Sequence, residues 1–236
     1  MITKQKNSIL QQFNPRNIKG GVTLFALIFA ISGGGYWLYR SFAATARVCS
    51  SFSEPIEITK GGTYSGCWQT TDRKTPAVRI STDQPVTITN SVITGNYILV
   101  KDSVAKVNLT ITYTDFIGTT PRYSTSSRRA IRLSSEASNL RVENNYFENT
   151  AGIKITGWAK TNGFNDPKTR TIKILRNKVK NITNAQVEAS ESGGSDHLVQ
   201  FVQLGQINKI AGAEIAWNEV INTYGQSRVE DNINLY

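Results

Sequence analysis

The stretch from Leu140 to Ile155 reads LRVENNYFENTAGIKI and contains the pattern that organises this chain. Leu140 and Val142 alternate with charged residues, which is the two-residue period of a strand with one buried face. Polar residues interrupt the apolar pattern at Asn145 and Asn149, and a further short strand is expected after each interruption. Three short strands with polar corners cannot bury their apolar faces alone, so the same unit must recur above and below.

The unit does recur, as VTITNSVITG, LTITYTDFIG, IKILRNKVKN and EIAWNEVIN. In one common register, the two apolar columns hold Ile88, Ile111, Val142, Ile174 and Ile215, and Ile93, Phe116, Phe147, Val179 and Val220. Two polar columns hold Ser91, Thr114, Asn145, Asn177 and Asn218, and Gly95, Gly118, Asn149, Asn181 and Asn222. This repetition predicts an all-β solenoid, a parallel β-helix of about five coils, rather than the competing antiparallel β-sandwich. The asparagine columns are expected to form hydrogen-bonded ladders at the corners, since buried polar groups need partners.

The chain has 236 residues and a net charge of +10, which suits one domain with an additional segment. Residues 1–46 contain five basic residues and no acid, so a charge of +5 remains on residues 47–236. No basic run interleaved with aromatic residues is present, which argues against nucleic-acid binding. The remaining positive charge favours acidic partners such as cell-surface glycans that contain uronate.

Residues 1–20 form a basic tail, and residues 21–39 form an uncharged segment just long enough to span a bilayer. The excess of basic residues before this segment predicts that the N-terminus stays inside and the rest of the chain is exported. Two interpretations remain open. The segment is either a single-pass anchor in the cell membrane or a long signal peptide, cleaved after Ala46 at the small-residue site Ala44-Thr45-Ala46, which would release a secreted protein.

Cys49 and Cys67 are the only two cysteines of the chain. In an oxidising compartment they should form a disulfide, which would stabilise the fold by roughly 3 kcal/mol in the chain-entropy model. The alternative is two unpaired structural cysteines. We expect residues 47–75 to form a cap on the first coil, and residues 76–236 to form the β-helix. The strand-like ending Val229–Tyr236 has no cap after it, so the β-helix is expected to be incomplete at its C-terminus.

The corners of the form Asn-x-apolar-x-Asn, such as NYFEN and NKVKN, resemble those of right-handed parallel β-helix proteins of the pectate-lyase-like superfamily. The segment KGGTYSG at residues 60–66 resembles the opening cap of bacterial secreted members. The resemblance covers roughly residues 49–236 and implies a right-handed β-helix. It implies no single activity, because the superfamily contains polysaccharide lyases, glycoside hydrolases and adhesins.

Outward-facing residues of the third strand in each coil are the candidate site. Lys101, Arg132 and Lys154 should stack about 4.8 Å apart, followed by Gln200 or Gln203 and then by Glu230 or Asp231. In a polysaccharide lyase, Arg132 could neutralise a uronate carboxylate, while Lys154 or His197 could remove the proton at C5. Substrate contacts are expected from Arg128, Arg129, Gln200, Arg228 and Trp158.

Asp196, Glu230 and Asp231 are candidate ligands for calcium, a cation that prefers several oxygen ligands. Asp196 with Glu230 or Asp231 could instead act as the carboxylate pair of a glycoside hydrolase. The expected function is therefore binding or degradation of an extracellular acidic polysaccharide, with a membrane contact through the N-terminal segment. The alternatives are a non-catalytic adhesin or wall-binding module and a truncated, inactive fragment.

Overall fold

The structure, a computed structural model, describes residues 47, 49–72, 74–119, 128–135, 137–157, 171–183, 199–207 and 210–236. They belong to one compact unit, Ala43–Tyr236. These residues form seventeen strands and no α-helix. They contain no helix with the length and hydrophobicity needed to cross a bilayer. The predicted basic tail and membrane or signal segment lie outside the described residues.

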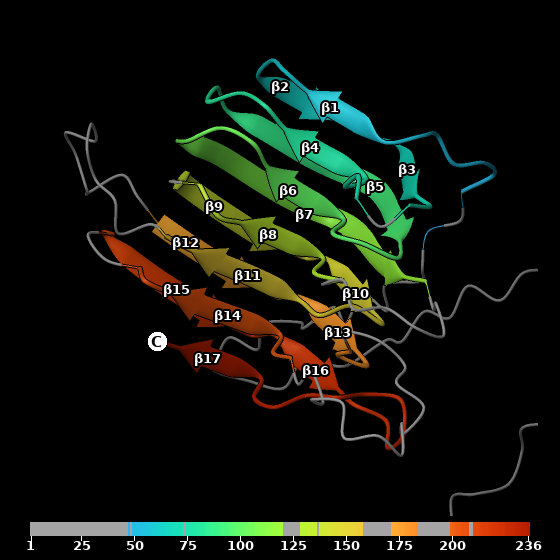
Figure 1. Cartoon of the computed structure of the whole chain (residues 1–236). Helices are drawn as coiled ribbons and strands as arrows, with labels where there is room; N and C mark the ends of the chain where they lie inside the picture. Colours follow the sequence, from blue (N-terminus) through green and yellow to red (C-terminus); the bar gives the residue numbers. More distant parts are fainter. Residues whose placement is uncertain are drawn as a thin grey trace, which may run out of the picture. The chain divides into compact units, whose positions relative to one another are not determined.

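The strands form two parallel sheets (Figure 1). One sheet receives a single strand from each coil and is called the single-arm sheet here. Its strands, in spatial order, are β1 (Ile56–Ile58), β4 (Val78–Ile80), β6 (Val100–Asp102), β8 (Ile131–Leu133), β11 (Ile153–Thr156), β14 (Val202–Gly205) and β17 (Ile233–Leu235).

The other sheet receives two consecutive arms from each coil and is called the two-arm sheet. Its strands are β2 (Gly62–Tyr64), β3 (Cys67–Thr70), β5 (Val86–Gly95), β7 (Val107–Gly118), β9 (Ala137–Glu143), β10 (Tyr146–Glu148), β12 (Thr171–Leu175), β13 (Lys178–Lys180), β15 (Gly212–Ala216) and β16 (Glu219–Ile221). β5 and β7 each continue through the corner into both arms, whereas the arms of the other coils are separate strands.

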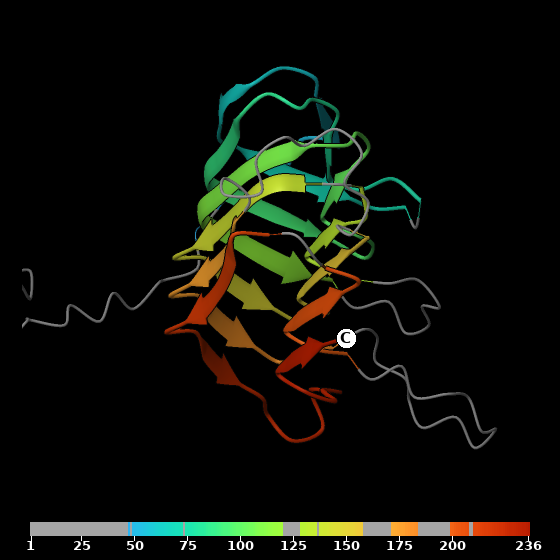
Figure 2. The ribbon, with the colours of Figure 1, turned by 90° about the vertical axis from the view of Figure 1, so that its left-hand side faces the viewer.

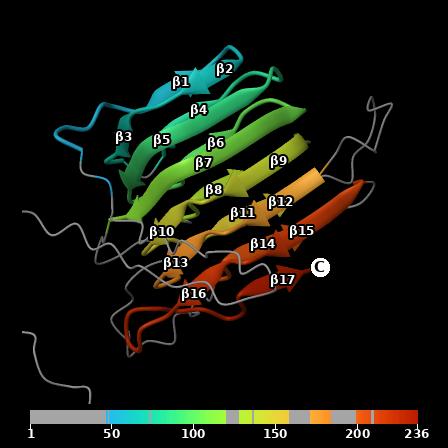
Figure 3. The same cartoon turned by 180° about the vertical axis from the view of Figure 1, so that it is seen from behind.

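Figure 2 shows the coils stacked along one axis from the blue N-terminal coil to the red C-terminal coil, and Figure 3 shows the same stack from behind. An all-β, solenoid-like architecture with parallel strands is thus confirmed.

The structure confirms the predicted register of both apolar columns. Ile88, Ile111, Val142, Ile174 and Ile215 are successive partners in the first arm. Ile93, Phe116, Phe147, Val179 and Val220 are successive partners in the second arm. Phe147 stacks on Phe116 with ring centroids 4.7 Å apart and meets Phe201 edge-on at 5.6 Å. The core is therefore a continuous stack of side chains from all three walls of the coil.

The corner between the two arms is held by the predicted polar ladder. The Asn177 side chain accepts hydrogen bonds from the backbone and side-chain nitrogens of Asn145, and it donates to the Val142 carbonyl. Asn218 repeats these bonds one coil later. The preceding residue has a positive φ in every coil with this corner: Asn90, Tyr113, Asn144, Arg176 and Trp217. This left-handed residue turns the chain, and the asparagine that follows it at positions 145, 177 and 218 forms hydrogen bonds with the buried backbone groups of the turn.

At the N-terminal end, residues 56–70 form a coil in register with the next one, through pairs such as Ile58–Ile80 and Tyr64–Ile88. Ser53 lies beside this coil, in a parallel bridge with Trp68 of β3. The Ser53 nitrogen donates to the Cys67 carbonyl, and the predicted disulfide joins Cys49 to Cys67. This end of the core is therefore well covered, and Ile58 is buried.

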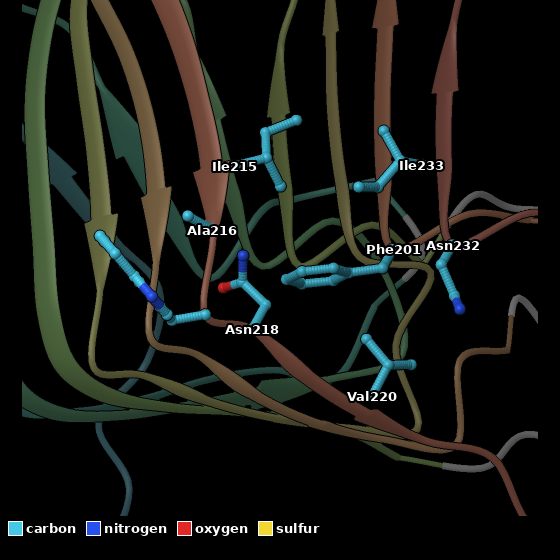
Figure 4. A pocket seen from close by; sticks show the side chains of 8 residues that line it. Phe201, Ile215, Ala216, Asn218, Val220, Asn232 and Ile233 are labelled. Carbon is cyan, nitrogen blue, oxygen red and sulfur yellow. The ribbon is translucent and has the colours of Figure 1, made fainter. Parts of the chain in front are cut away.

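At the C-terminal end the last coil leaves its core side chains accessible. Ile233 is 46% exposed and Leu235 is 67% exposed, whereas their register equivalents Ile153 and Ile155 on β11 are fully buried. A hollow of about 300 Å³ opens here, with the Phe201 ring directed into it (Figure 4). Its lining consists of Phe201, Ile215, Ala216, Trp217, Asn218, Val220, Asn232 and Ile233. The hollow is an open end of the core and brings no group of charged residues together.

Candidate functional site

The outer positions of the single-arm sheet form a column of basic side chains. Arg79, Lys101, Arg132 and Lys154 are the second residues of β4, β6, β8 and β11, and each is the register partner of the next. Adjacent strands lie about 4.8 Å apart, so the four residues extend over about 14 Å along the solenoid. We call these four residues the cationic column. Glu57 precedes it on β1, and Gln203 and Asn234 follow it on β14 and β17.

Strand alternation forces these side chains outward. Arg132 lies between Ile131 and Leu133, which are fully buried in the core, and Lys154 lies between two further buried isoleucines. Because successive side chains of a strand point to opposite faces, the residue between two core residues must face outward. The two-residue alternation that places apolar side chains in the core therefore also places these basic side chains in one outer column.

Arg129 reaches the column from the turn before β8. It is only 6% exposed, and its Nη1 donates to the Ala151 carbonyl at 2.7 Å, while its Nη2 donates to Oε1 of Gln203 at 2.9 Å. Burial lowers the pKa of Arg129 to about 10, and the positive charge of Arg132 contributes to the shift. Arg129 is thus a positive charge held beside the column by hydrogen bonds.

Lys154 is affected by both guanidinium groups. Burial lowers the pKa of its ammonium, and the charges of Arg129 and Arg132 lower it further. These three residues are consequently close enough to repel one another. A lysine in such a place loses its proton more readily than an exposed lysine and can accept a proton from a ligand.

The four cations of the column take part in none of the ion pairs found in the described part of the chain. The Nε of Arg132 is buried and has no hydrogen-bond partner there. Like charges on neighbouring strands destabilise a sheet. A ligand that carries several negative charges would remove this repulsion.

Other residues predicted to contact substrate have different environments. Arg128 is buried, and its Nη1 donates to the Thr119 carbonyl, which ties the turn before β8 to the end of β7. Gln200 is also buried, and its side chain donates to Glu230. The backbone nitrogen of Arg228 donates to the Ile182 carbonyl.

The predicted positions of Glu230 and Asp231 in the column are wrong, because Asn234 is the partner of Gln203 on β17. Asp231 instead accepts a hydrogen bond from the Asn234 side chain at 3.3 Å. The described residues contain no group of three or more histidine, cysteine or acidic side chains that could hold a metal ion. Asp196, His197 and Trp158 lie outside the described residues, so the calcium site and the histidine base remain predictions.

Arg79 is the member of the cationic column that the sequence analysis did not single out. Arg79 lies in Val-Arg-Ile at residues 78–80, the same pattern as Ile-Arg-Leu at residues 131–133. That alternation could have identified it. The position of Arg129 beside Lys154 depends on the reach of its side chain across two strands. The two-residue alternation of strand sequences does not predict such a contact.

Comparisons of this chain with protein-family models, with curated proteins and with solved structures found no match.

Proposed function

We propose that this protein is exported and binds an acidic polysaccharide along the cationic column. The observation that carries the proposal is the in-register series of Arg79, Lys101, Arg132 and Lys154, none of which forms an ion pair with a described residue. A row of positive charges at a regular strand spacing suits a long, regularly charged chain better than a small anion. Each strand step is similar in length to one sugar ring, so successive uronate residues could meet successive cations.

The proposed fold is the right-handed parallel β-helix of the pectate-lyase-like superfamily. Three strands in each coil, the asparagine ladder at one corner and the left-handed residue before it support this assignment. The fold does not decide between a binding protein and an enzyme.

The lowered pKa of Lys154 favours a second candidate, a polysaccharide lyase. Arg132 would pair with the uronate carboxylate, which makes the neighbouring C5 proton more acidic. Lys154 in its neutral form would take that proton, and the electron pair of the broken C5–H bond would form the C4–C5 double bond. The C4–O glycosidic bond would break, and its oxygen would take a proton from water to become a hydroxyl group. Arg129 would keep the pKa of Lys154 low.

Binding is tested by titrating the purified protein with a polyuronate and with a neutral polysaccharide of similar length, by calorimetry at low and high salt. We expect binding to the polyuronate alone and a fall in affinity with salt, since attraction between charges is screened. Equal binding to both polymers would contradict the proposal. Absorbance of an unsaturated product in the ultraviolet, lost in Lys154→Ala but not in Lys101→Ala, would identify the lyase.

A further inference from the structure

Asp115 is a buried carboxylate on the outer side of the second arm of β7. It is 5% exposed, and its Oδ2 accepts a hydrogen bond of 2.7 Å from the backbone nitrogen of Arg47. Its register partners are Val92 on β5 and Tyr146 on β10, and neither carries a positive charge. Among the described residues Asp115 forms no ion pair within 4 Å.

This carboxylate is incompletely compensated. Burial raises the pKa of Asp115, although the hydrogen bond from Arg47 and the more distant Arg47 guanidinium act in the opposite direction. A buried carboxylate with one neutral donor is costly unless a positive charge is added. The atom already in contact with Asp115 is a backbone nitrogen, which becomes positively charged when it is the N-terminus of a chain.

Arg47 occupies the position where such an N-terminus is expected. It directly follows Ala44-Thr45-Ala46, and small residues at the first and third positions before the bond mark cleavage by a signal peptidase. The motif and the contact with Asp115 are independent observations, and both select the same nitrogen atom.

We propose that a signal peptidase cleaves the Ala46–Arg47 bond and that the new α-ammonium group of Arg47 forms an ion pair with Asp115. Water supplies the hydroxyl group that converts the Ala46 carbonyl to a carboxylate, and the amide nitrogen of Arg47 takes up protons to become the ammonium group. Cleavage occurs on the extended chain before folding, so the half-buried position of Arg47 in the folded protein does not prevent it.

The adjacent structure holds this end in place. The disulfide from Cys49 to Cys67 fixes the chain two residues after Arg47, and β3, which begins at Cys67, pairs with β5 beside β7. The short tether keeps the new N-terminus near Asp115 after residues 1–46 have left. This proposal is independent of polysaccharide binding and favours the secreted form over the anchored form.

The first test is the N-terminal sequence and intact mass of the full chain after expression in a host that exports it. We expect a protein that begins at Arg47 and contains one disulfide. A protein that retains residues 1–46, or that begins at another residue, would overturn the proposal.

The second test compares Asp115→Asn in the processed protein and in a chain made uncleavable by Ala46→Trp. The introduced amide can still accept the hydrogen bond but carries no charge. In the processed protein the substitution removes an ion pair, and we expect the melting temperature to fall by roughly 4 °C or more. In the uncleaved chain the same substitution removes an uncompensated buried charge, and we expect an unchanged or higher melting temperature.

Asp83→Asn is the matched control, because Asp83 is exposed. It should leave the melting temperature of both forms nearly unchanged. Each comparison is made within one form of the protein, so detergent needed for the uncleaved chain affects both members equally. An effect of Asp115→Asn with the same sign in both forms would refute the ion pair.

Discussion

The outer faces of the two sheets both carry charges but arrange them differently. On the two-arm sheet, Glu143 pairs with Arg141 and with Arg176, the latter at 2.8 Å. Lys180 pairs with Glu148 at 2.9 Å, and Lys178 lies 3.8 Å from Glu219. On the single-arm sheet, each cation of the column has another cation as its neighbour on at least one side.

This difference distinguishes a face whose charges are paired from the face on which we propose that the polysaccharide binds. Charges on the two-arm sheet are neutralised within the protein, so a charged polymer would have to displace existing partners. Charges on the cationic column have no such partners among the described residues and are available to a ligand. The net charge of the protein therefore does not indicate where a polyanion would bind. The charges on neighbouring strands indicate this better, because they show whether a cation is already paired.

The largest expected effect is on polymer binding after charge reversal. Arg132→Glu with Lys154→Glu should weaken polyuronate binding by about 100-fold or more, which corresponds to about 3 kcal/mol. Lys178→Glu with Lys180→Glu changes the net charge equally on the other face and should weaken binding only a few-fold. Calorimetric titration of both variants, after thermal melts show that each is folded, makes the comparison. Equal losses would mean that binding responds to net charge and that the two faces do not differ in function.

A second prediction concerns the corner that keeps the coils in register and therefore keeps the column aligned. Asn177→Ala leaves the Asn145 nitrogen and the Val142 carbonyl without their buried partners. The free energy of unfolding should fall by about 3 kcal/mol. Asn234→Ala, on the outer face of β17, should change the free energy of unfolding by less than about 0.5 kcal/mol. Urea denaturation measures both, and similar losses would show that the corner ladder has no special role.

The period of Leu140–Ile155 predicted the stacked coils, the corner ladder and the adjacency of Arg132 and Lys154. These features follow from which residues share a column, and a two-residue period with polar corners determines that directly. The same pattern predicted that the loops between successive coils differ in length. It could not determine where the chain re-enters the sheet after a long loop, and the column position given to Glu230 or Asp231 belongs to Asn234 for that reason.

The environment of Arg129 could not be predicted from the sequence for a different reason, which is that it depends on contacts with two later coils. Its guanidinium is placed by the carbonyl of Ala151 in the next coil and by Gln203 in the coil after that. Such contacts depend on side-chain reach across strands rather than on strand period. The contact of Arg47 with Asp115 is similar, since 68 residues separate the two in sequence. Sequence patterns therefore predicted the frame of the solenoid better than the contacts made from its turns.

A third prediction makes the two faces more alike. Glu143→Gln removes the carboxylate that pairs with Arg141 and Arg176, so two cations on the two-arm sheet lose their partner. The free energy of unfolding should fall by about 1–2 kcal/mol, because the carboxylate is largely buried and both pairs are lost. Weak additional polyuronate binding should appear on this face. Glu214→Gln, an exposed acid on the same arm, is the control for both measurements. No change in stability would show that the ion pairs of this face are energetically neutral.

The smallest expected effect is also the most direct measure of repulsion within the column. Arg132→Gln removes the charge between Lys101 and Lys154, so stability at low salt should rise by about 0.5 kcal/mol, and the gain should vanish at high salt. The pKa of Lys154 should move back toward its ordinary value of 10.5, because Arg132 is one of the causes of its lowering. A lysine whose pKa is lowered by folding binds its proton more weakly in the folded state. Wild-type stability should therefore increase as the pH rises from the lowered pKa toward 10.5, and Arg132→Gln should reduce this increase.

Thermal melts at two salt concentrations and across this pH range test the prediction. Lys178→Gln is the matched control, since it removes a cation that has an acidic neighbour and should lower stability slightly or leave it unchanged. If Arg132→Gln destabilises the protein at low salt, then Arg132 is already compensated within the folded chain. The column would then resemble the two-arm face, and a polyanion would gain nothing by binding there.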